Sequence, residues 1–280
     1  MSQDVLRARV LEAARAGGAE AVAAAWFDYR HRTEWSLNGD EWFHAASTIK
    51  VPVLLGVYGA IEAGRFEPHS RVHVRNRFLS VVDGAPFRVE PQRDANRAVH
   101  AAVGKTMRVV ELARHMIVTS SNLATNLLVD LVGLDEIRRT IDELHISGIE
   151  VVRGVEDEPA WQAGLNNRAT AHGLLAALRA IEEGRAVSEH ASSEMLAILH
   201  DQEFRSGIPA GLPDEARVAN KTGEMSTVAH DAGIVYLPDR EPYVLVVLTR
   251  WTPDATARQR TIAAISRAVF EHITEGDGDA

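Results

Sequence analysis

Three short motifs place serine and lysine side chains at spacings that suit acyl transfer. Ser47 stands three residues before Lys50, Ser120-Ser121-Asn122 follows, and Lys221-Thr222-Gly223 comes nearer the end of the chain. Lysine is rare, since only three of the 30 basic residues are lysine. Arginine cannot replace it as a base, because the guanidinium group keeps its proton near neutral pH. The two motif lysines therefore predict a serine nucleophile assisted by an amine.

The pair Ser47 and Lys50 has the spacing of two residues on one face of a helix, so the amine can reach the hydroxyl. A serine hydroxyl is a weak nucleophile until a base takes its proton. Lysine serves as a base only when desolvation or a nearby positive charge lowers its pKa, and Lys221 would supply such a charge. At the start of a helix, the backbone N–H of Ser47 is also predicted to bind an oxyanion.

The other two motifs supply groups for the leaving atom and for the substrate. We expect Ser120 to pass a proton to the leaving nitrogen, and Asn122 to hold Lys50 and a substrate amide. Lys221 and Thr222 would bind a substrate carboxylate.

Gly223 and Glu224 complete the predicted substrate-binding set. Because glycine has no side chain, Gly223 allows a substrate backbone to lie against the strand edge. The backbone N–H of Glu224 is predicted to be the second oxyanion donor.

The elements that must position these residues follow from apolar periodicity and from capping residues. We predict helices over residues 4–16, 47–63, 107–118, 122–131, 135–144, 170–182, 188–200 and 255–271. Strands are predicted over 21–29 and 33–37, which form a hairpin, and over 216–221, 229–237 and 243–251. Residues 65–105 are predicted to be mostly loop with short strands, residues 153–168 to be a loop, and the end of the chain to be frayed.

Strands at both ends and helices in the middle predict an α+β fold. An antiparallel sheet built from both chain ends is flanked by helices, and an all-helical lobe is inserted into it. We expect residues 1–64 and 207–280 to form the lobe with the sheet. Residues 65–206 would form the helical lobe, which carries the middle motif.

Composition excludes several classes of function. The net charge of -9 argues against nucleic acid as a partner, because phosphate binding needs a basic face. The chain has no cysteine, which excludes disulfides and thiolate catalysis. Histidines lack the H-E-x-x-H spacing of a zinc site, so we predict no metal site. The absence of a cofactor is expected only from the family resemblance described below. We further expect a monomer without a membrane segment, cytoplasmic as the sequence stands, and periplasmic or secreted if a leader was removed.

Taken together, the motifs resemble those of the class A serine β-lactamases and their penicillin-binding relatives. Residues 45–50 are similar to the nucleophile helix of that family, and residues 220–223 to its third motif. Residues 119–128 resemble its middle motif, which usually has aspartate where Ser121 stands. The resemblance covers nearly the whole chain and implies acylation of Ser47 by a β-lactam, followed by hydrolysis of the acyl-enzyme.

Three departures from the family pattern bear on this expectation. The family has a deacylating glutamate in an omega loop, and here Glu156 falls nearest to its place, with Glu158 next; both can equally belong to a solvated acidic loop. Glu224 would stand beside the bound carboxylate and repel it. His230 stands where the family commonly has an arginine for this carboxylate, and we favour the interpretation that it is a plain strand residue.

Two functions therefore remain open. The first is hydrolysis of β-lactam amides through an acyl-enzyme on Ser47, with Glu156 as the deacylating residue. The alternative is a D-alanyl-D-alanine peptidase, an esterase or another amidase on the same fold. The substrate is then a small β-lactam or a compound like an acyl-D-amino acid. The sequence leaves open whether Lys50 or the loop acid is the base for acylation.

Overall fold

The structure is a computed structural model that describes residues 2–275. The end predicted to be frayed spans residues 275–280; Glu275 is the last residue of a helix, and residues 276–280 lie outside the described residues. The chain forms two compact units. Unit 1 comprises the chain up to Thr48, Ala169–Arg179 and the chain from Phe204 onward, and unit 2 comprises Ile49–Arg168 and Ala180–Glu203. The limits expected from the sequence differ mainly in placing the helix after Ser47 with the sheet.

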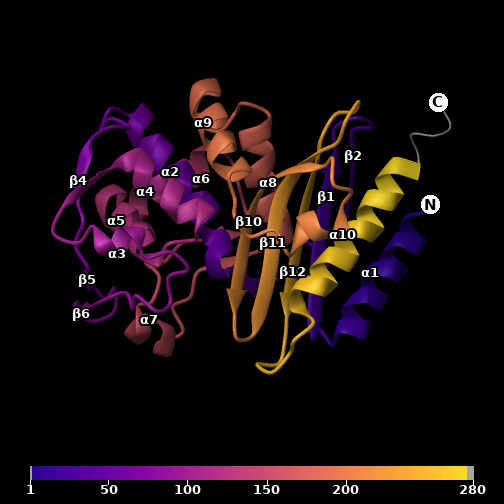
Figure 1. Ribbon diagram of the computed structural model, residues 1–280, viewed down its shortest axis with the longest axis horizontal. Helices are drawn as coiled ribbons and strands as arrows, with labels where there is room; N and C mark the ends of the chain where they lie inside the picture. Colours follow the sequence, from indigo (N-terminus) through magenta and orange to yellow (C-terminus); the bar gives the residue numbers. More distant parts are fainter. Residues whose placement is uncertain (1, 276–280) are drawn as a thin grey trace. The chain divides into compact units, whose positions relative to one another are not determined.

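Unit 1 is built on a five-stranded antiparallel sheet in the order β10-β11-β12-β1-β2 (Figure 1). Its strands come from both ends of the chain: β1 (Ala21–Asp28), β2 (Thr33–Leu37), β10 (Arg217–Met225), β11 (Val228–Tyr236) and β12 (Tyr243–Arg250). This arrangement confirms the predicted α+β fold with a sheet made from both termini. Since β10 lies at one edge of the sheet, the third motif is on an edge strand.

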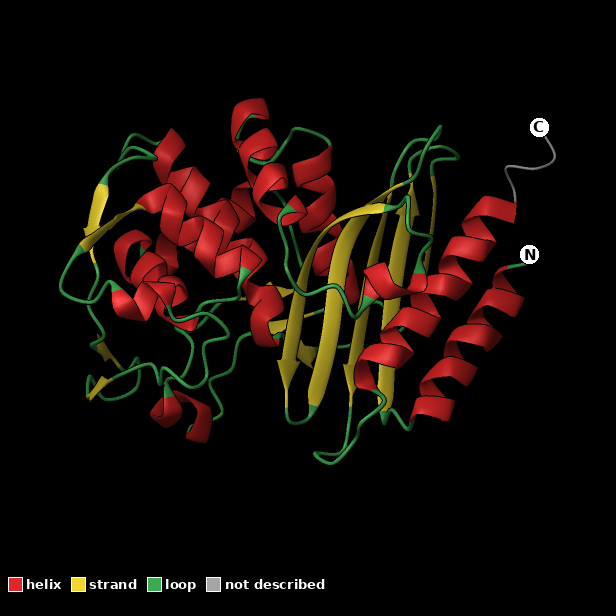
Figure 2. Ribbon diagram, viewed as in Figure 1, coloured by secondary structure: helices red, strands yellow, loops and turns green. Residues whose placement is uncertain are grey.

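Two helices cover one face of this sheet and bury its core. α1 (Gln3–Gly17) and α10 (Arg258–Glu275) lie side by side in Figure 2. Alternate strand residues such as Trp26 and Leu245 are buried against these helices. Phe27 points to the opposite face, because successive strand side chains alternate. There it lies under the guanidinium group of Arg179, 3.6 Å from the ring centre.

The remaining elements of unit 1 are short, except for the first part of α8. They are β3 (Phe43–His44), η1 (Ala46–Ile49, which ends at the junction with unit 2), the part of α8 (Ala171–Glu182) up to Arg179, and η2 (Ile208–Gly211).

Unit 2 is organised around α2 (Lys50–Glu62), which is buried on almost all sides. A helix that is apolar all round is expected in the interior of a protein. α6 (Leu134–Glu143) approaches it closely at Gly56 and Gly59. A Cβ atom at these glycines would lie 2.6 Å from Ile137 Cγ1 and 2.5 Å from Thr140 Oγ1, so the contact requires glycine at both positions.

The other elements of unit 2 surround this helix or form its outer loops. They are β4 (Arg71–His73), β5 (Phe78–Leu79), β6 (Pro86–Phe87), α3 (Ala98–Ala101), β7 (Thr106–Arg108), α4 (Val109–Val118), α5 (Asn122–Val132), β8 (Ile149–Glu150), α7 (Glu158–Gln162) and α9 (Glu189–His200). The short strand β9 (Arg168–Ala169) has its first residue in unit 2 and its second in unit 1.

Among the sequence-based element predictions that differ from the structure in their bounds, two bear on the site. The strand predicted over 216–221 continues to Met225, so the third motif lies inside β10 and not at its end. The loop predicted over 153–168 contains the short helix α7, which Asp157 caps by accepting from the backbone N–H of Ala160. Residues 153–168 were predicted to be a loop because they are polar, and the Asp157 cap nonetheless allows one short helix there. In β10, pairing with β11 continues the strand to Met225.

None of the described helices is long and apolar enough to cross a membrane.

Candidate active site

Unit 2 brings four of the predicted site residues into one hydrogen-bonded cluster. Lys50 is fully buried, and its Nζ lies 2.6 Å from Ser120 O, 3.1 Å from Ser120 Oγ and 2.8 Å from Asn122 Oδ1. Asn122 Nδ2 donates to Glu156 Oε1 over 2.7 Å. Because the amide oxygen accepts from an amine and the amide nitrogen donates to a carboxylate, the orientation of Asn122 is fixed by both neighbours.

Burial is the main cause of the unusual acidity of Lys50. Desolvation lowers the pKa of Lys50 from 10.5 to about 7, against the opposing effects of the Asp94 and Glu156 carboxylates. A buried amine with such a pKa is a candidate general base near neutral pH. We expected desolvation or the charge of Lys221 to lower this pKa, and desolvation is the cause that the structure shows.

Local backbone geometry presents Ser120 and Glu156 to this cluster. Both residues have positive φ, 55° for Ser120 and 60° for Glu156. This left-handed conformation is uncommon outside glycine and often occurs at functional sites. Ser121 follows as the N-cap of α5, so Ser120 lies in the break between two helices, as predicted.

The structure separates the two candidate acids of the loop. Glu156 contacts Asn122 and accepts from the backbone N–H of Glu90 at 3.1 Å, and its side chain is only 9% exposed. Glu158 is exposed on α7, where it accepts from Gln162 Nε2 at 3.4 Å. Of the two acids, only Glu156 contacts the Lys50 cluster, through Asn122.

Unit 1 places Ser47 beside the third motif. Ser47 is partly exposed in η1, which runs directly into α2. A Cβ atom on Gly223 would lie 3.1 Å from Ser47 N, 3.0 Å from Thr48 N and 3.1 Å from Ala45 O. The backbone of β10 thus packs against the nucleophile segment at a distance that only glycine allows without a shift.

Lys221 and Thr222 precede this close approach on the same strand. Lys221 is fully buried, and its Nζ donates to Thr222 O over 2.8 Å. Thr222 is partly exposed.

Glu224 has its carboxylate directed to α10. It accepts from Gln259 Nε2 at 2.8 Å, and Arg258 Nη1 lies 3.6 Å away. The positive charge of Arg258 offsets the repulsion that we expected between Glu224 and a substrate carboxylate.

His230 has the surroundings of a structural strand residue. It is fully buried, its Nε2 lies 2.9 Å from His44 O, and its Nδ1 accepts from the backbone N–H of Thr249 at 3.1 Å. Desolvation lowers the pKa of His230 to about 4, so the ring is neutral near pH 7. A neutral buried ring does not provide the charge that would replace an arginine.

Sequence reasoning missed two buried carboxylates near these residues. Asp94 accepts from Ser121 Oγ at 2.9 Å and contributes to the charge environment of Lys50. Asp231 accepts from Asn220 Nδ2 at 2.9 Å and from the backbone N–H of Ile208 at 2.8 Å, and burial raises its pKa to about 6. The position of Asp231 within the apolar run of β11 could have indicated a buried carboxylate. Asp94 lies in a loop far from the motifs in the sequence, and no pattern in the sequence indicated its burial.

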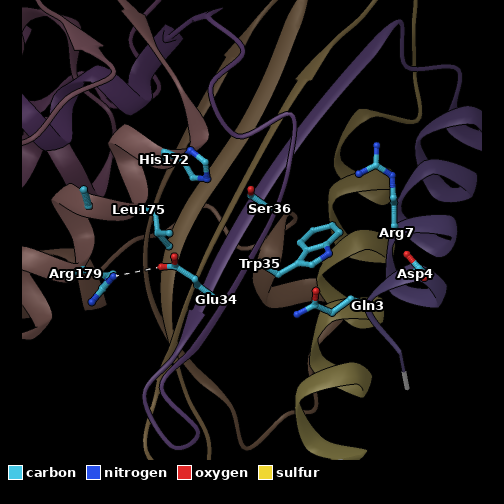
Figure 3. A pocket seen from close by; sticks show the side chains of 10 residues that line it. Gln3, Asp4, Arg7, Glu34, Trp35, Ser36, His172, Leu175 and Arg179 are labelled. Atoms are coloured by element: carbon cyan, nitrogen blue, oxygen red, sulfur yellow. Dashed lines mark ion pairs between the residues drawn. The ribbon is translucent and has the colours of Figure 1, made fainter.

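A separate hollow of about 650 Å³ lies beside the edge strand β2 in unit 1 (Figure 3). Arg179 Nη1 and Glu34 Oε2 face each other there at 3.9 Å. The lining contains no residue of the three motifs; it consists of Gln3, Asp4, Arg7, Glu34, Trp35, Ser36, His172, Leu175, Ala176 and Arg179. This hollow is therefore not part of the candidate active site.

Comparison with known families gives the context for these residues. The model of the β-lactamase enzyme family matches residues 6–273, which is nearly the whole chain. The chain belongs to the β-lactamase enzyme family. This membership confirms the resemblance to class A serine β-lactamases that the motifs predicted, and it identifies the chain as a hydrolase of the β-lactamase type.

Individual β-lactamases agree with this membership. A β-lactamase from Streptomyces fradiae is 30% identical over 255 residues, covering 84% of this chain and 76% of that protein. The crystal structure of a β-lactamase from Sphaerobacter thermophilus is 29% identical with a TM-score of 0.80, covering 97% of this chain and 98% of that one. The structure of PBP-A has a TM-score of 0.83 at 22% identity over 98% and 97% of the two chains, which shows the same fold.

Proposed function

We propose that this member of the β-lactamase family hydrolyses β-lactam amides through an acyl-enzyme on Ser47. The observation that carries the proposal is the buried amine of Lys50, which burial holds at a pKa of about 7 among Ser120, Asn122 and Glu156. Burying an amine is costly, and this cluster provides hydrogen-bonding partners for it. A purely structural role would be met at lower cost by an apolar side chain.

In the proposed acylation, Lys50 accepts the proton of Ser47. Neither Ser120 O nor Asn122 Oδ1 carries a proton, so Lys50 must donate to both. The neutral amine then has one lone pair left, which can accept a proton. Lys50 follows Ser47 by three residues in continuous helical chain, the spacing at which side chains on a helix meet.

The ring opens as the bond between Ser47 Oγ and the carbonyl carbon forms and the carbon–nitrogen bond breaks. We assign proton delivery to the leaving nitrogen to Ser120, because its Oγ lies 3.1 Å from Lys50 Nζ. The proton taken from Ser47 can return through this contact. The backbone N–H groups of Ser47 and Glu224 are the proposed oxyanion donors.

Deacylation is assigned to Glu156. Its Oε1 accepts from Asn122 Nδ2 and its Oε2 from Glu90 N, which fixes the carboxylate next to the Lys50 cluster. As general base, Glu156 takes a proton from water while the water oxygen attacks the acyl carbon. The bond from that carbon to Ser47 Oγ then breaks, and the proton held by Glu156 returns to Ser47 Oγ, which regenerates both groups.

Lys221 and Thr222 are the proposed ligands of the substrate carboxylate. Gly223 keeps β10 close to the Ser47 backbone. Lys221 and Thr222, which precede Gly223 on this strand, therefore lie near the nucleophile segment within unit 1. Because Gln259 and Arg258 bind the Glu224 carboxylate, its charge is less of an obstacle to an anionic substrate.

A fluorescent penicillin tests the proposal. We expect wild-type protein to form a covalent adduct, and Ser47→Ala to form none while keeping its fold. Ser226→Ala is the matched control, since Ser226 is exposed at the turn between β10 and β11, and it should label like the wild type. Labelling of Ser47→Ala would show that another residue is the nucleophile.

The alternative function, a D-alanyl-D-alanine peptidase, esterase or other amidase, gives a different result in the same assay. An acyl-enzyme that persists without release of hydrolysed penicillin would favour it over β-lactam hydrolysis.

A further inference from the structure

A tight turn lies against the Lys50 cluster in unit 2, and none of its residues belongs to the three motifs. The backbone N–H of Arg93 donates to Glu90 O over 2.9 Å, with Pro91 at the second position of the turn. Proline favours this position because its φ is already fixed near the required value. Asp94 follows directly after the turn.

Asp94 holds the beginning of α5. Its side chain is fully buried and accepts from Ser121 Oγ at 2.9 Å, from the backbone N–H of Asn122 at 2.5 Å and from the backbone N–H of Leu123 at 3.3 Å. The first N–H groups of a helix have no partner within the helix, and a carboxylate there is favoured by the helix dipole. Asp94 thus fixes the backbone from which the Asn122 side chain projects.

His100 completes the surroundings of this carboxylate. Its Nε2 lies 3.1 Å from Asp94 Oδ2, and its side chain is 9% exposed. The imidazole comes from α3, in the same loop region as Asp94. With four contacts, three of them from the start of α5, Asp94 has little freedom to move.

The same turn also holds Glu156. The N–H of Glu90 donates to Glu156 Oε2 at 3.1 Å, while Asn122 Nδ2 donates to Glu156 Oε1 at 2.7 Å. Hydrogen bonds and chain therefore close a ring that runs from Asp94 to Asn122, to Glu156, to Glu90 and back through the turn. The position of Asn122 between Lys50 and Glu156 depends on this ring.

Charge connects Asp94 with Lys50 as well. The carboxylates of Asp94 and Glu156 both raise the pKa of Lys50 against desolvation. The charged groups around this cluster are Lys50, Asp94 and Glu156, with His100 beside Asp94 and Arg93 at 3.9 Å from Glu156. Removal of the Asp94 charge alone should therefore lower the pKa of Lys50 further.

We propose that Asp94, held by His100, is a positioning residue for the reaction, which fixes Asn122 between Lys50 and Glu156. The proposal rests on the proposed function, in which Lys50 and Glu156 act on the acyl group. Asp94 itself touches neither substrate nor Ser47 in this role. It acts through the backbone of α5 and through its charge.

Asp94→Asn tests the proposal, because asparagine keeps the size of the side chain but removes its charge. One of its two polar atoms is then a donor that faces other donors. Asp28→Asn is the matched control: Asp28 is also buried, 2.8 Å from both His31 Nδ1 and Arg240 Nη2, but belongs to unit 1.

The first readout is the titration of Lys50 by NMR of protein labelled at lysine Cε. The chain has three lysines, so three signals are expected. We predict that the pKa of Lys50 falls in Asp94→Asn and stays unchanged in Asp28→Asn. The double variant Asp94→Asn with Ser121→Asp returns a carboxylate to the cap of α5 and should restore the titration.

The second readout is the pH profile of acylation by penicillin. Since a small displacement of a reacting group can cost about a hundredfold in rate, we expect Asp94→Asn to slow acylation about 10- to 100-fold. The acid limb of the pH–rate profile of Asp94→Asn should move to lower pH, because Lys50 then loses its proton more readily. A residue that only stabilises the fold would lower the amount of active protein and leave the limb in place.

An unchanged Lys50 titration in folded Asp94→Asn overturns the proposal, as does the same change in Asp28→Asn. If wild-type protein is not acylated at all, the proposed function fails, while the titration still decides the role of Asp94. If Asp94→Asn does not fold, His100→Leu is compared with His100→Gln, which can still donate to Asp94. We expect His100→Leu to be acylated more slowly than His100→Gln. Equal acylation rates in these two variants would contradict the proposal.

Discussion

Replacement of Lys50 by methionine should change how the stability of the protein depends on pH. Burial lowers the pKa of Lys50 from 10.5 to about 7, and each pKa unit corresponds to about 1.4 kcal/mol. Protonated Lys50 is therefore penalised by about 5 kcal/mol in the folded state. Methionine has a similar length and carries no charge, so it removes this penalty.

The sign of the effect follows from proton binding. Between pH 7 and 10.5, the unfolded chain keeps the Lys50 proton and the folded protein has released it. Above pH 10.5, Lys50 is neutral in both states and its protonation does not oppose folding. As the pH falls from 10.5 toward 7, the free energy of unfolding decreases, because only the unfolded chain binds this proton. Methionine also leaves Ser120 O and Asn122 Oδ1 without their donor, but this cost is the same at every pH.

The assay is urea unfolding of wild type and Lys50→Met at several pH values. The free energy of unfolding of wild type minus that of Lys50→Met should increase by about 2 kcal/mol between about pH 7 and pH 9. The difference cancels all other titrations that the two proteins share. Lys105→Met is the control, since Lys105 is exposed, and its difference from wild type should not depend on pH in this way. A constant or decreasing difference for Lys50→Met would refute the reasoning about a buried, mostly desolvated amine.

Two further substitutions separate the steps of the proposed reaction. Glu156→Gln should keep acylation but slow turnover by about a hundredfold or more, because the general base for water is lost; turnover at the wild-type rate, followed by absorbance of the β-lactam, would assign deacylation to another residue. Gly223→Ala should slow acylation while leaving deacylation of preformed adduct nearly unchanged, because its Cβ would lie 3.0 to 3.1 Å from the backbone of residues 45–48 and must displace it. Stopped-flow rates equal to wild type would show that the nucleophile segment tolerates the added methyl group.

Most elements of the fold could be predicted because their signals are local. The hairpin of β1 and β2 follows from two β-rich runs with a short turn. The helix predicted over residues 188–200 is α9, which Ser188 caps. The end of β10 was not predictable in this way. Gly223 weakens the strand signal, yet the glycine is there because the backbone of residues 45–48 comes within contact distance.

The candidate site was predictable only where motif spacing carries it. Ser47, Lys50, Ser120 and Lys221 are set by short motifs, and their roles remain predictions for experiment. The choice between Glu156 and Glu158 depends on a residue with φ of 60°, which the acidic loop sequence does not indicate. Asp94 was missed because its contacts join residue 94 to residues 121–123, and no spacing rule relates these positions.

The central claim is that Ser47 forms an acyl-enzyme that water then hydrolyses. Intact-protein mass spectrometry after mixing with a penicillin tests it most directly, with wild type and Ser47→Ala followed over time. We predict that the wild type gains the mass of one penicillin and then loses it as hydrolysed penicillin accumulates, while Ser47→Ala stays at its own mass. A wild type that gains no mass, or Ser47→Ala that gains it as fast, would contradict the account.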